Sequence, residues 1–270
     1  MFEKKSGIMI NSTIKGFLVA GMMAMASLQS MAQGPPIFTE TPIMLGLEGR
    51  GIRTFGRYVE AENGKAYMQV MAVPYNVSAK FQVGGVVPLV WKSPDGIPQR
   101  SGLGDVGVFV KQQILQKDGK GKTLRALLKA TAGLPTGNTS KEPALGSGAW
   151  QAGFGAVAGY ITTRLGLYAE TGYRWVSDEL PDQYFYNLAA SVPLLPQKYP
   201  PRQLNLSADL NGNVNVSTGS QALFLSPGLQ YIAGRRLLME TGIQLPLAED
   251  APAGHQTNFA LLLGARILIF

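Results

Sequence analysis

The chain has 270 residues, a formal net charge of +7 and 46% hydrophobic residues. It has no cysteine, which excludes a disulfide framework, a thiol nucleophile and an iron–sulfur centre. Lysines and arginines stand singly rather than in basic runs, so the positive balance does not predict a nucleic-acid partner. One histidine and scattered carboxylates do not form a metal-ligand pattern, and we expect no metal and no cofactor. Beyond the N-terminus, no stretch approaches the roughly 18 apolar residues of a membrane-spanning helix, which excludes an all-helical membrane protein.

Residues 1–32 are typical of a secretory signal peptide. Lysines precede an apolar run at 16–28, and Ser30-Met31-Ala32 then places small residues where a signal peptidase reads the chain. We therefore expect cleavage before Gln33, with Met9 as an alternative start of translation. The apolar run is shorter than the ~20 residues of a spanning helix, which disfavours a membrane anchor.

Residues 33–47 form an N-terminal lead-in segment. Three prolines, Pro35, Pro36 and Pro42, fall within it, and no alternation of apolar and polar residues begins before about residue 48. One interpretation is a flexible lead-in. The other is a partial plug that folds into the periplasmic mouth of the structure built by the rest of the chain.

The stretch from 150 to 175 carries the clearest structural pattern. One set of alternate residues is apolar or aromatic apart from two threonines: Trp150, Ala152, Phe154, Ala156, Ala158, Tyr160, Thr162, Leu165, Leu167, Ala169, Thr171, Tyr173 and Trp175. The interleaved residues are mostly polar or glycine. Strand side chains point alternately to opposite faces, so this pattern predicts two strands with one apolar face each. Trp150 and Tyr160 are roughly 33 Å apart along a strand, or about 25 Å in height at a ~40° tilt, which matches the apolar band of an outer-membrane barrel.

Twelve segments are expected to be strands: 48–61, 66–77, 79–93, 102–117, 123–136, 149–163, 165–178, 183–194, 202–211, 220–233, 235–247 and 256–270. Short and longer connections alternate between them, as expected of periplasmic turns and outer loops. The connection 195–201 breaks this rule because it is long and rich in proline. The sequence predicts an all-β fold, a transmembrane antiparallel up-and-down β-barrel of about twelve strands that occupies 48–270 as one domain. A soluble β-sandwich is disfavoured because it rarely places Trp and Tyr at both ends of a buried strand face.

The two faces of these strands predict two sets of residues. The apolar face carries the aromatic girdle: Phe81, Trp91, Trp150, Tyr160, Tyr173, Trp175 and Tyr231. The opposite face would line the lumen and set selectivity: Arg53, Arg57, Lys80, Asp105, Lys111, Arg125, Lys129, Glu170, Arg174, Asp209, Glu240 and Arg266. A lipid-facing Arg or Lys at mid-depth costs roughly 2–4 kcal/mol, which favours the inward assignment.

Two interpretations of the inward charges remain open. They fill the lumen by pairing, with Glu170 to Arg174 and Asp105 to Arg125 or Lys129 as plausible pairs. Alternatively, they form a weakly cationic passage that favours anions or polarised aromatic compounds.

Several short motifs follow one another along the chain: Gly34-Pro35-Pro36-Ile37-Phe38-Thr39, Gly102-Leu103-Gly104-Asp105, Leu134-Pro135-Thr136-Gly137, Leu145-Gly146-Ser147-Gly148 and Tyr186-Asn187-Leu188. In this order they resemble the outer-membrane transporters of the "MetA-pathway of phenol degradation" family. The resemblance implies an outer-membrane barrel that passes small aromatic or apolar compounds. Relatives usually carry two acidic residues after the early Thr, where this chain has Glu40-Thr41-Pro42.

The second and third motifs lie where neighbouring strands meet outer loops. Pro135 and Gly137 can be read simply as residues that end a strand. The alternative is a rim that shapes an entry site, with Asp105 as its polar anchor.

The last strand ends in Phe270. A terminal aromatic residue resembles the signal read by the barrel assembly machinery, which is therefore an expected partner beside outer-membrane lipids. Counting back in twos from Phe270 gives the less apolar face. Either a bulge shifts the register near the end, or Phe270 points inward.

The expected function is passive uptake or diffusion of small solutes, aromatic or hydrophobic compounds among them, across the outer membrane of a Gram-negative bacterium. One alternative is a structural or adhesion barrel closed by its own charge pairs. Another is an outer-membrane lipid hydrolase, which needs a histidine base beside a serine nucleophile. The one histidine, His255, stands in a loop with no Ser two positions away, so we expect no enzyme.

Overall fold

The computed structural model describes residues 35–196, 202–252 and 254–269. The predicted signal peptide at 1–32 and the terminal Phe270 lie outside these ranges. Over the described residues, the structure has no helix long and apolar enough to cross a bilayer.

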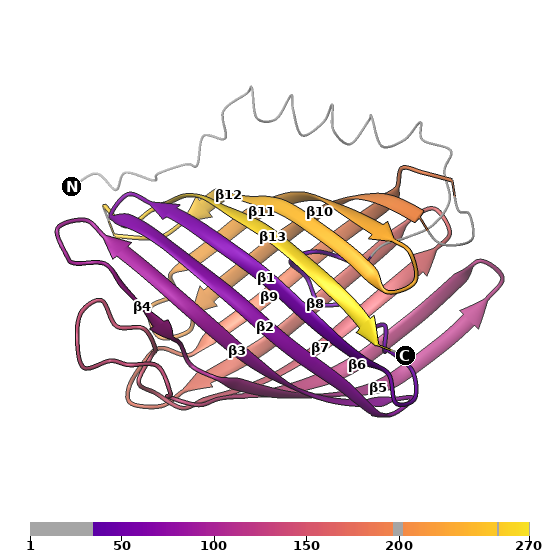
Figure 1. Cartoon of the computed structure of the whole chain (residues 1–270), viewed down its shortest axis with the longest axis horizontal. Coiled ribbons are helices and arrows are strands. Elements are labelled where there is room, and N and C mark those ends of the chain that lie inside the picture. The colour runs from indigo at the N-terminus through magenta and orange to yellow at the C-terminus, as the bar shows by residue number, and fades with distance from the viewer. Residues whose placement is uncertain (1–34, 197–201, 253, 270) are drawn as a thin grey trace, which may run out of the picture. The chain divides into compact units, whose positions relative to one another are not determined.

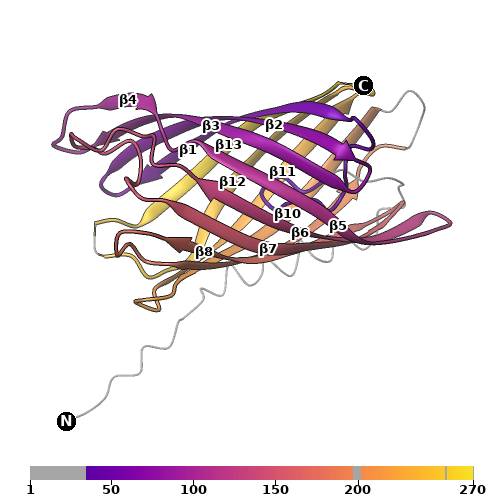
Figure 2. The ribbon, with the colours of Figure 1, turned by 90° about the horizontal axis from the view of Figure 1, so that it is seen from below.

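In the part of the chain that the structure describes, thirteen strands form one antiparallel sheet. Their bounds are β1 (Arg50–Ala61), β2 (Gly64–Ser78), β3 (Phe81–Pro94), β4 (Arg100–Leu103), β5 (Gly107–Gly119), β6 (Lys122–Gly133), β7 (Gln151–Thr162), β8 (Gly166–Val176), β9 (Gln183–Pro193), β10 (Arg202–Asn215), β11 (Gln221–Ala233), β12 (Leu237–Glu249) and β13 (Thr257–Ile269). Twelve of them close into a barrel because β1 pairs with both β2 and β13. The predicted fold is confirmed. The strands run obliquely around the barrel and enclose the segment that precedes β1, drawn in indigo (Figures 1 and 2).

The thirteenth strand, β4, comes from a break that the sequence did not reveal within 102–117. β4 pairs with the end of β3, and β5 pairs with the beginning of β3. Between them, 104–106 face only Val87 and Pro88, so one strand carries an extra residue, as in a β-bulge. Pro88 has no backbone N–H to donate, and its carbonyl accepts from Gly104 N at 2.9 Å.

The two ends of the barrel differ in their connections. Turns of two or three residues join β2 to β3, β5 to β6, β7 to β8 and β11 to β12 at the end where β1 begins. Longer loops, above all 134–150, lie at the other end, where only β1 and β2 are joined by two residues among the described connections; this is the outer end by the usual barrel rule. β9 and β10, on either side of the irregular connection, pair directly from Pro193–Asn205 to Gln183–Asn215.

Burial alternates along the strands as the two-faced pattern predicts. In β8, Tyr168 and Glu170 are buried inside the barrel, whereas Leu167 and Tyr173 are exposed on its outer side. The outer side of β13 carries Leu263 at 72% exposure, and apolar side chains cover the outside of the other strands in the same way. The inward parity of β13 (Leu262, Gly264, Arg266, Leu268) runs on to its end, with no bulge between Phe259 and Ile269.

The predicted aromatic girdle falls at both ends of the outer face. Tyr160, Tyr231 and the half-exposed Phe81 lie near the short-turn end, and the other four residues (Trp91, Trp150, Tyr173 and Trp175) lie near the loop end. Three further tyrosines, which were not predicted, are exposed on the same face: Tyr67, Tyr75 and Tyr184. Tyr67 packs against Trp91 with 5.4 Å between ring centroids.

Candidate functional site in the barrel lumen

The segment before β1 crosses the inside of the barrel, and donors from the wall bind its carbonyls. Gln230 Nε2 donates to Pro35 O at 3.0 Å, Arg266 Nη2 to Pro36 O at 2.9 Å and Arg53 Nη2 to Ile37 O at 2.8 Å. Pro35 and Pro36 suit these positions, because proline offers a carbonyl but no N–H that would need an acceptor.

The next three residues turn their amides to carboxylates of the wall. Phe38 N and Thr39 N donate to Asp209 Oδ2 at 3.2 and 2.8 Å, and Glu40 N donates to Glu170 Oε2 at 3.0 Å. Six consecutive residues, 35–40, are thus bound through their backbone. Side-chain donors of the wall bind the carbonyls of the segment, and carboxylates of the wall bind its amides. Backbone groups that would otherwise be buried without a partner are therefore satisfied.

Two ionic clusters surround the segment. Glu240 is buried between two arginines, with Arg53 Nη2 at 2.8 Å from Oε1 and Arg266 Nη2 at 2.8 Å from Oε2. The second cluster joins Glu40 to Lys111 Nζ at 3.0 Å and to Lys129 Nζ at 3.4 Å, while Lys129 also lies 3.4 Å from Glu170. Burial alone would raise the pKa of Glu40, but Lys111 and Lys129 outweigh it and hold this pKa well below its ordinary value.

Glycines on the inner wall make room for the side chains of the segment. A Cβ at Gly242 would lie 2.6 Å from a ring carbon of Phe38, and one at Gly159 would lie 2.8 Å from Pro42. Further along, Met44 packs into a buried cluster with Leu127 and Val157 of the wall. The segment can lie this close to the wall only because positions 159 and 242 are glycines, which have no Cβ.

A family model described as "Putative MetA-pathway of phenol degradation" matches residues 58–260. The chain belongs to this family. A comparison with curated proteins found no match.

Solved outer-membrane barrels share the fold of this family member. The COG4313 outer membrane channel from Pseudomonas putida F1 has a TM-score of 0.69 at 13% identity, over 86% of this chain and 100% of that one. The KdgM porin complex with disordered oligogalacturonate has a TM-score of 0.51 at 8% identity, over 81% and 99%. The NanC porin has a TM-score of 0.51 at 11% identity, over 80% and 98%. The described residues have the fold of these barrels, a closed antiparallel sheet with an apolar outer face.

Seven of the twelve residues predicted to line the lumen lie together around the segment: Arg53, Lys111, Lys129, Glu170, Asp209, Glu240 and Arg266. Arg57 also points inward, where its Nη2 donates to Gln244 Oε1 at 2.7 Å. Arg174 lies exposed toward the outer end of β8 and donates to Gln183.

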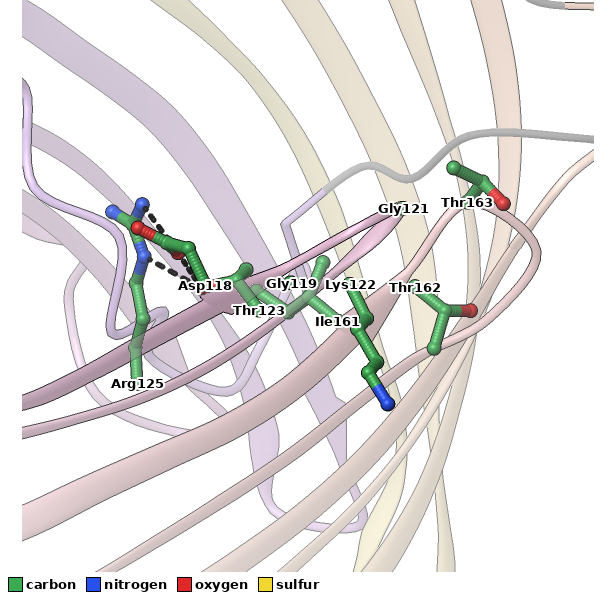
Figure 3. Close-up of a pocket in the computed structure, with 9 residues that line it drawn as sticks. All are labelled: Asp118, Gly119, Gly121, Lys122, Thr123, Arg125, Ile161, Thr162 and Thr163. Carbon is green, nitrogen blue, oxygen red and sulfur yellow. Dashed lines mark hydrogen bonds and ion pairs between the residues drawn. The ribbon is translucent and has the colours of Figure 1, made fainter.

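The remaining three predicted residues lie elsewhere. Lys80 does not line the lumen, because it lies exposed in the turn between Ser78 and the start of β3. The predicted strand began at residue 79, two residues too early. Arg125 pairs with Asp118 at 3.6 Å near the short-turn end, beside a hollow of about 450 Å³ under the β5–β6 and β7–β8 turns (Figure 3). Asp105 binds the outer loop instead of a lumen cation.

The anticipated ion pairs were therefore wrong. Glu170 pairs with Lys129 rather than with Arg174. Asp105 accepts from Gly137 N at 2.9 Å and from Ser147 N and Oγ at 2.6 and 2.7 Å, rather than from Arg125 or Lys129. Glu170 on β8 and Lys129 on β6 lie on either side of β7, and pairing within one strand or between adjacent strands does not reveal such a contact.

Neutral amides of the site were missed as well. The residues predicted to line the lumen were all charged. The neutral Gln230, Gln244 and Asn187 were therefore not among them. Their signal was available, because each falls on the inward parity of its strand, and Gln230 and Gln244 are buried there.

Proposed function

We propose that this protein is an outer-membrane channel for passive diffusion of small solutes, and that residues 35–47 restrict its lumen as a partial plug. One observation carries the proposal: charged and amide side chains gather inside a closed barrel around a peptide segment, while the outer face is apolar. The family description suggests small aromatic or hydrophobic compounds as solutes. No energy-coupling segment was found in the sequence, so transport would run down a gradient.

The test is conductance of the refolded mature chain in planar bilayers, together with swelling of liposomes in solutes of graded size. Replacing 33–42 by a glycine–serine stretch of equal length removes the side chains of the segment but keeps the chain length. We expect conductance to rise several-fold, because Ile37, Phe38 and Glu40 no longer fill the lumen.

Unchanged conductance in this variant would refute the plug but leave the channel standing. If neither form conducts or swells liposomes, the channel itself is refuted and a closed structural or adhesion barrel is favoured.

Two further parts of the proposal concern partners and chemistry. We propose that β13, together with the Phe270 that follows it in the sequence, is recognised by the barrel assembly machinery; Phe270 itself lies outside the described residues. We propose no enzymatic activity, since His255 lies in the exposed loop between β12 and β13.

A further inference from the structure

We propose that Lys111 and Lys129 form a binding site for the carboxylate of a small organic solute, and that Glu40 occupies this site as an internal substitute. The inference rests on the proposed channel function and names a substrate class for it.

The wall itself leaves the two lysines without enough negative charge. Lys111 on β5 and Lys129 on β6 are direct register partners, and like charges placed opposite one another destabilise a sheet. Among the described ion pairs, Glu170 of the wall pairs with Lys129 and not with Lys111. Across the described residues, the ion pair of Lys111 is with Glu40, which belongs to the segment and not to the barrel.

Both lysines converge on a single atom of the segment. Lys111 Nζ lies 3.0 Å and Lys129 Nζ 3.4 Å from Glu40 Oε2. Two ammonium groups around one carboxylate oxygen are the arrangement that a free carboxylate would need. The Glu40 side chain therefore marks the position of the ligand group.

Glu40 can leave this position while the segment stays in place. The backbone of 35–40 is held independently by Gln230, Arg266, Arg53, Asp209 and Glu170. The other oxygen of Glu40 accepts a 3.3 Å bond from Thr41 N within the segment itself. Rotation of one side chain is enough to open the site, and withdrawal of the segment is not required.

The surroundings suit an organic acid better than a small inorganic anion. The ring of Phe109 lies 4.8 Å from Lys111 Nζ. Cations beside apolar surface match a carboxylate with an apolar body.

Single-channel recording with sodium benzoate as the probe tests the proposal. In the full mature chain, Glu40→Gln removes the internal competitor, which is present at an effective concentration of order millimolar because it is tethered. We expect benzoate to interrupt the current at a concentration about tenfold lower in Glu40→Gln than in the wild type. Benzyl alcohol, which has no carboxylate, should interrupt the current neither in the wild type nor in Glu40→Gln.

A matched pair of second substitutions separates a site from a diffuse positive field. Each is added to Glu40→Gln and removes one inward cation: Lys111→Gln from the site, or Arg57→Gln from a position bonded to neutral Gln244. Loss of the benzoate effect with Lys111→Gln alone supports the site. Equal loss with both, or a wild type as sensitive as Glu40→Gln, overturns it.

The site can fail or stand independently of the channel. If no form conducts, calorimetric titration of benzoate into detergent-solubilised Glu40→Gln still measures binding, and absence of heat there overturns the site. Heat-dependent gel mobility checks that each variant is a folded barrel. Should Glu40→Gln not fold, the replacement of 33–42 vacates the same site and takes its place in both measurements.

Discussion

Two irregular stretches of this protein are tied to the barrel by the same device, a carboxylate that accepts backbone amides. Inside the lumen, Asp209 accepts from Phe38 and Thr39. At the outer rim, Asp105 accepts from Gly137 and Ser147 of the loop that joins β6 to β7. These hydrogen bonds satisfy backbone amides that have no partner strand.

The two stretches differ in what else they bind. The lumen segment is bonded to strands all around the ring, from β1 at Arg53 to β8 at Glu170, so it links opposite walls. The rim loop is bonded to one neighbouring region, where Lys92 donates to Ala144 O and Arg100 to Pro143 O. Loss of the first anchor should therefore change the pore, whereas loss of the second should change only the rim.

Asp209→Ala should give the largest effect among single substitutions. Hydrogen bonds to a charged group contribute about 1.5–3 kcal/mol each, so losing two weakens docking of the segment by roughly 3 kcal/mol. We expect higher mean conductance and frequent transitions between levels in single-channel records. Asn211→Ala is the matched control, because Asn211 is on the same strand and face but bonds to Asn187, Ser226 and Gln244 of the wall. A segment that stays docked in Asp209→Ala would show that this anchor is dispensable.

Gly242→Ala should have a smaller effect of the same kind. The new Cβ meets the Phe38 ring at 2.6 Å, and the ring must shift. We expect a moderate rise in conductance and a lower temperature of unfolding, measured by heat-dependent gel mobility. Phe38→Ala in the same chain should restore the temperature of unfolding, because the smaller side chain leaves room for the methyl group. Gly107→Ala provides the control, since its nearest neighbour would lie 3.5 Å away, an ordinary contact. Failure of Phe38→Ala to restore the temperature of unfolding would place the strain elsewhere in the wall.

The outward-facing side of the strands could be predicted well from the sequence, because contact with lipid constrains it. Outward strand positions at membrane depth are mostly apolar, so the period-two pattern of Leu167 and Tyr173 against Glu170 indicates the strand, its face and its span. The inner wall has no such rule. Its polar positions are interchangeable by pattern, and Glu170 could be placed inward but not matched to Lys129 and Glu40, which come from distant parts of the chain.

The rim shows the same limit at a smaller scale. Asp105 follows the inward parity in sequence, yet the bulge at 104–106 turns it toward Gly137 and Ser147. No alternation pattern encodes a bulge. Pro135 and Gly137 fit either residues that end a strand or a rim anchored by Asp105, and the bonds that Asp105 accepts from Gly137 and Ser147 favour the second interpretation.

Asp105→Asn should give the smallest effect on conductance and a clear one on the rim. Partial burial raises the pKa of Asp105, but hydrogen bonds from Ser147 and Gly137, with Lys92 nearby, hold this pKa below its ordinary value. A lowered pKa in the folded protein means that the anchor stabilises the loop above the ordinary aspartate pKa of about 3.9 and is lost only as pH falls through the lower, folded value.

A nitroxide on Lys141→Cys reads the motion of the loop, and it labels a single site because the natural chain has no cysteine. In the wild type, the label should stay immobile from neutral pH down to the ordinary aspartate pKa and become mobile only below it. With Asp105→Asn it should be mobile at every pH, because the amide cannot accept from both Gly137 and Ser147. Mobility that appears in the wild type above the ordinary pKa would mean that another group, and not Asp105, holds the rim.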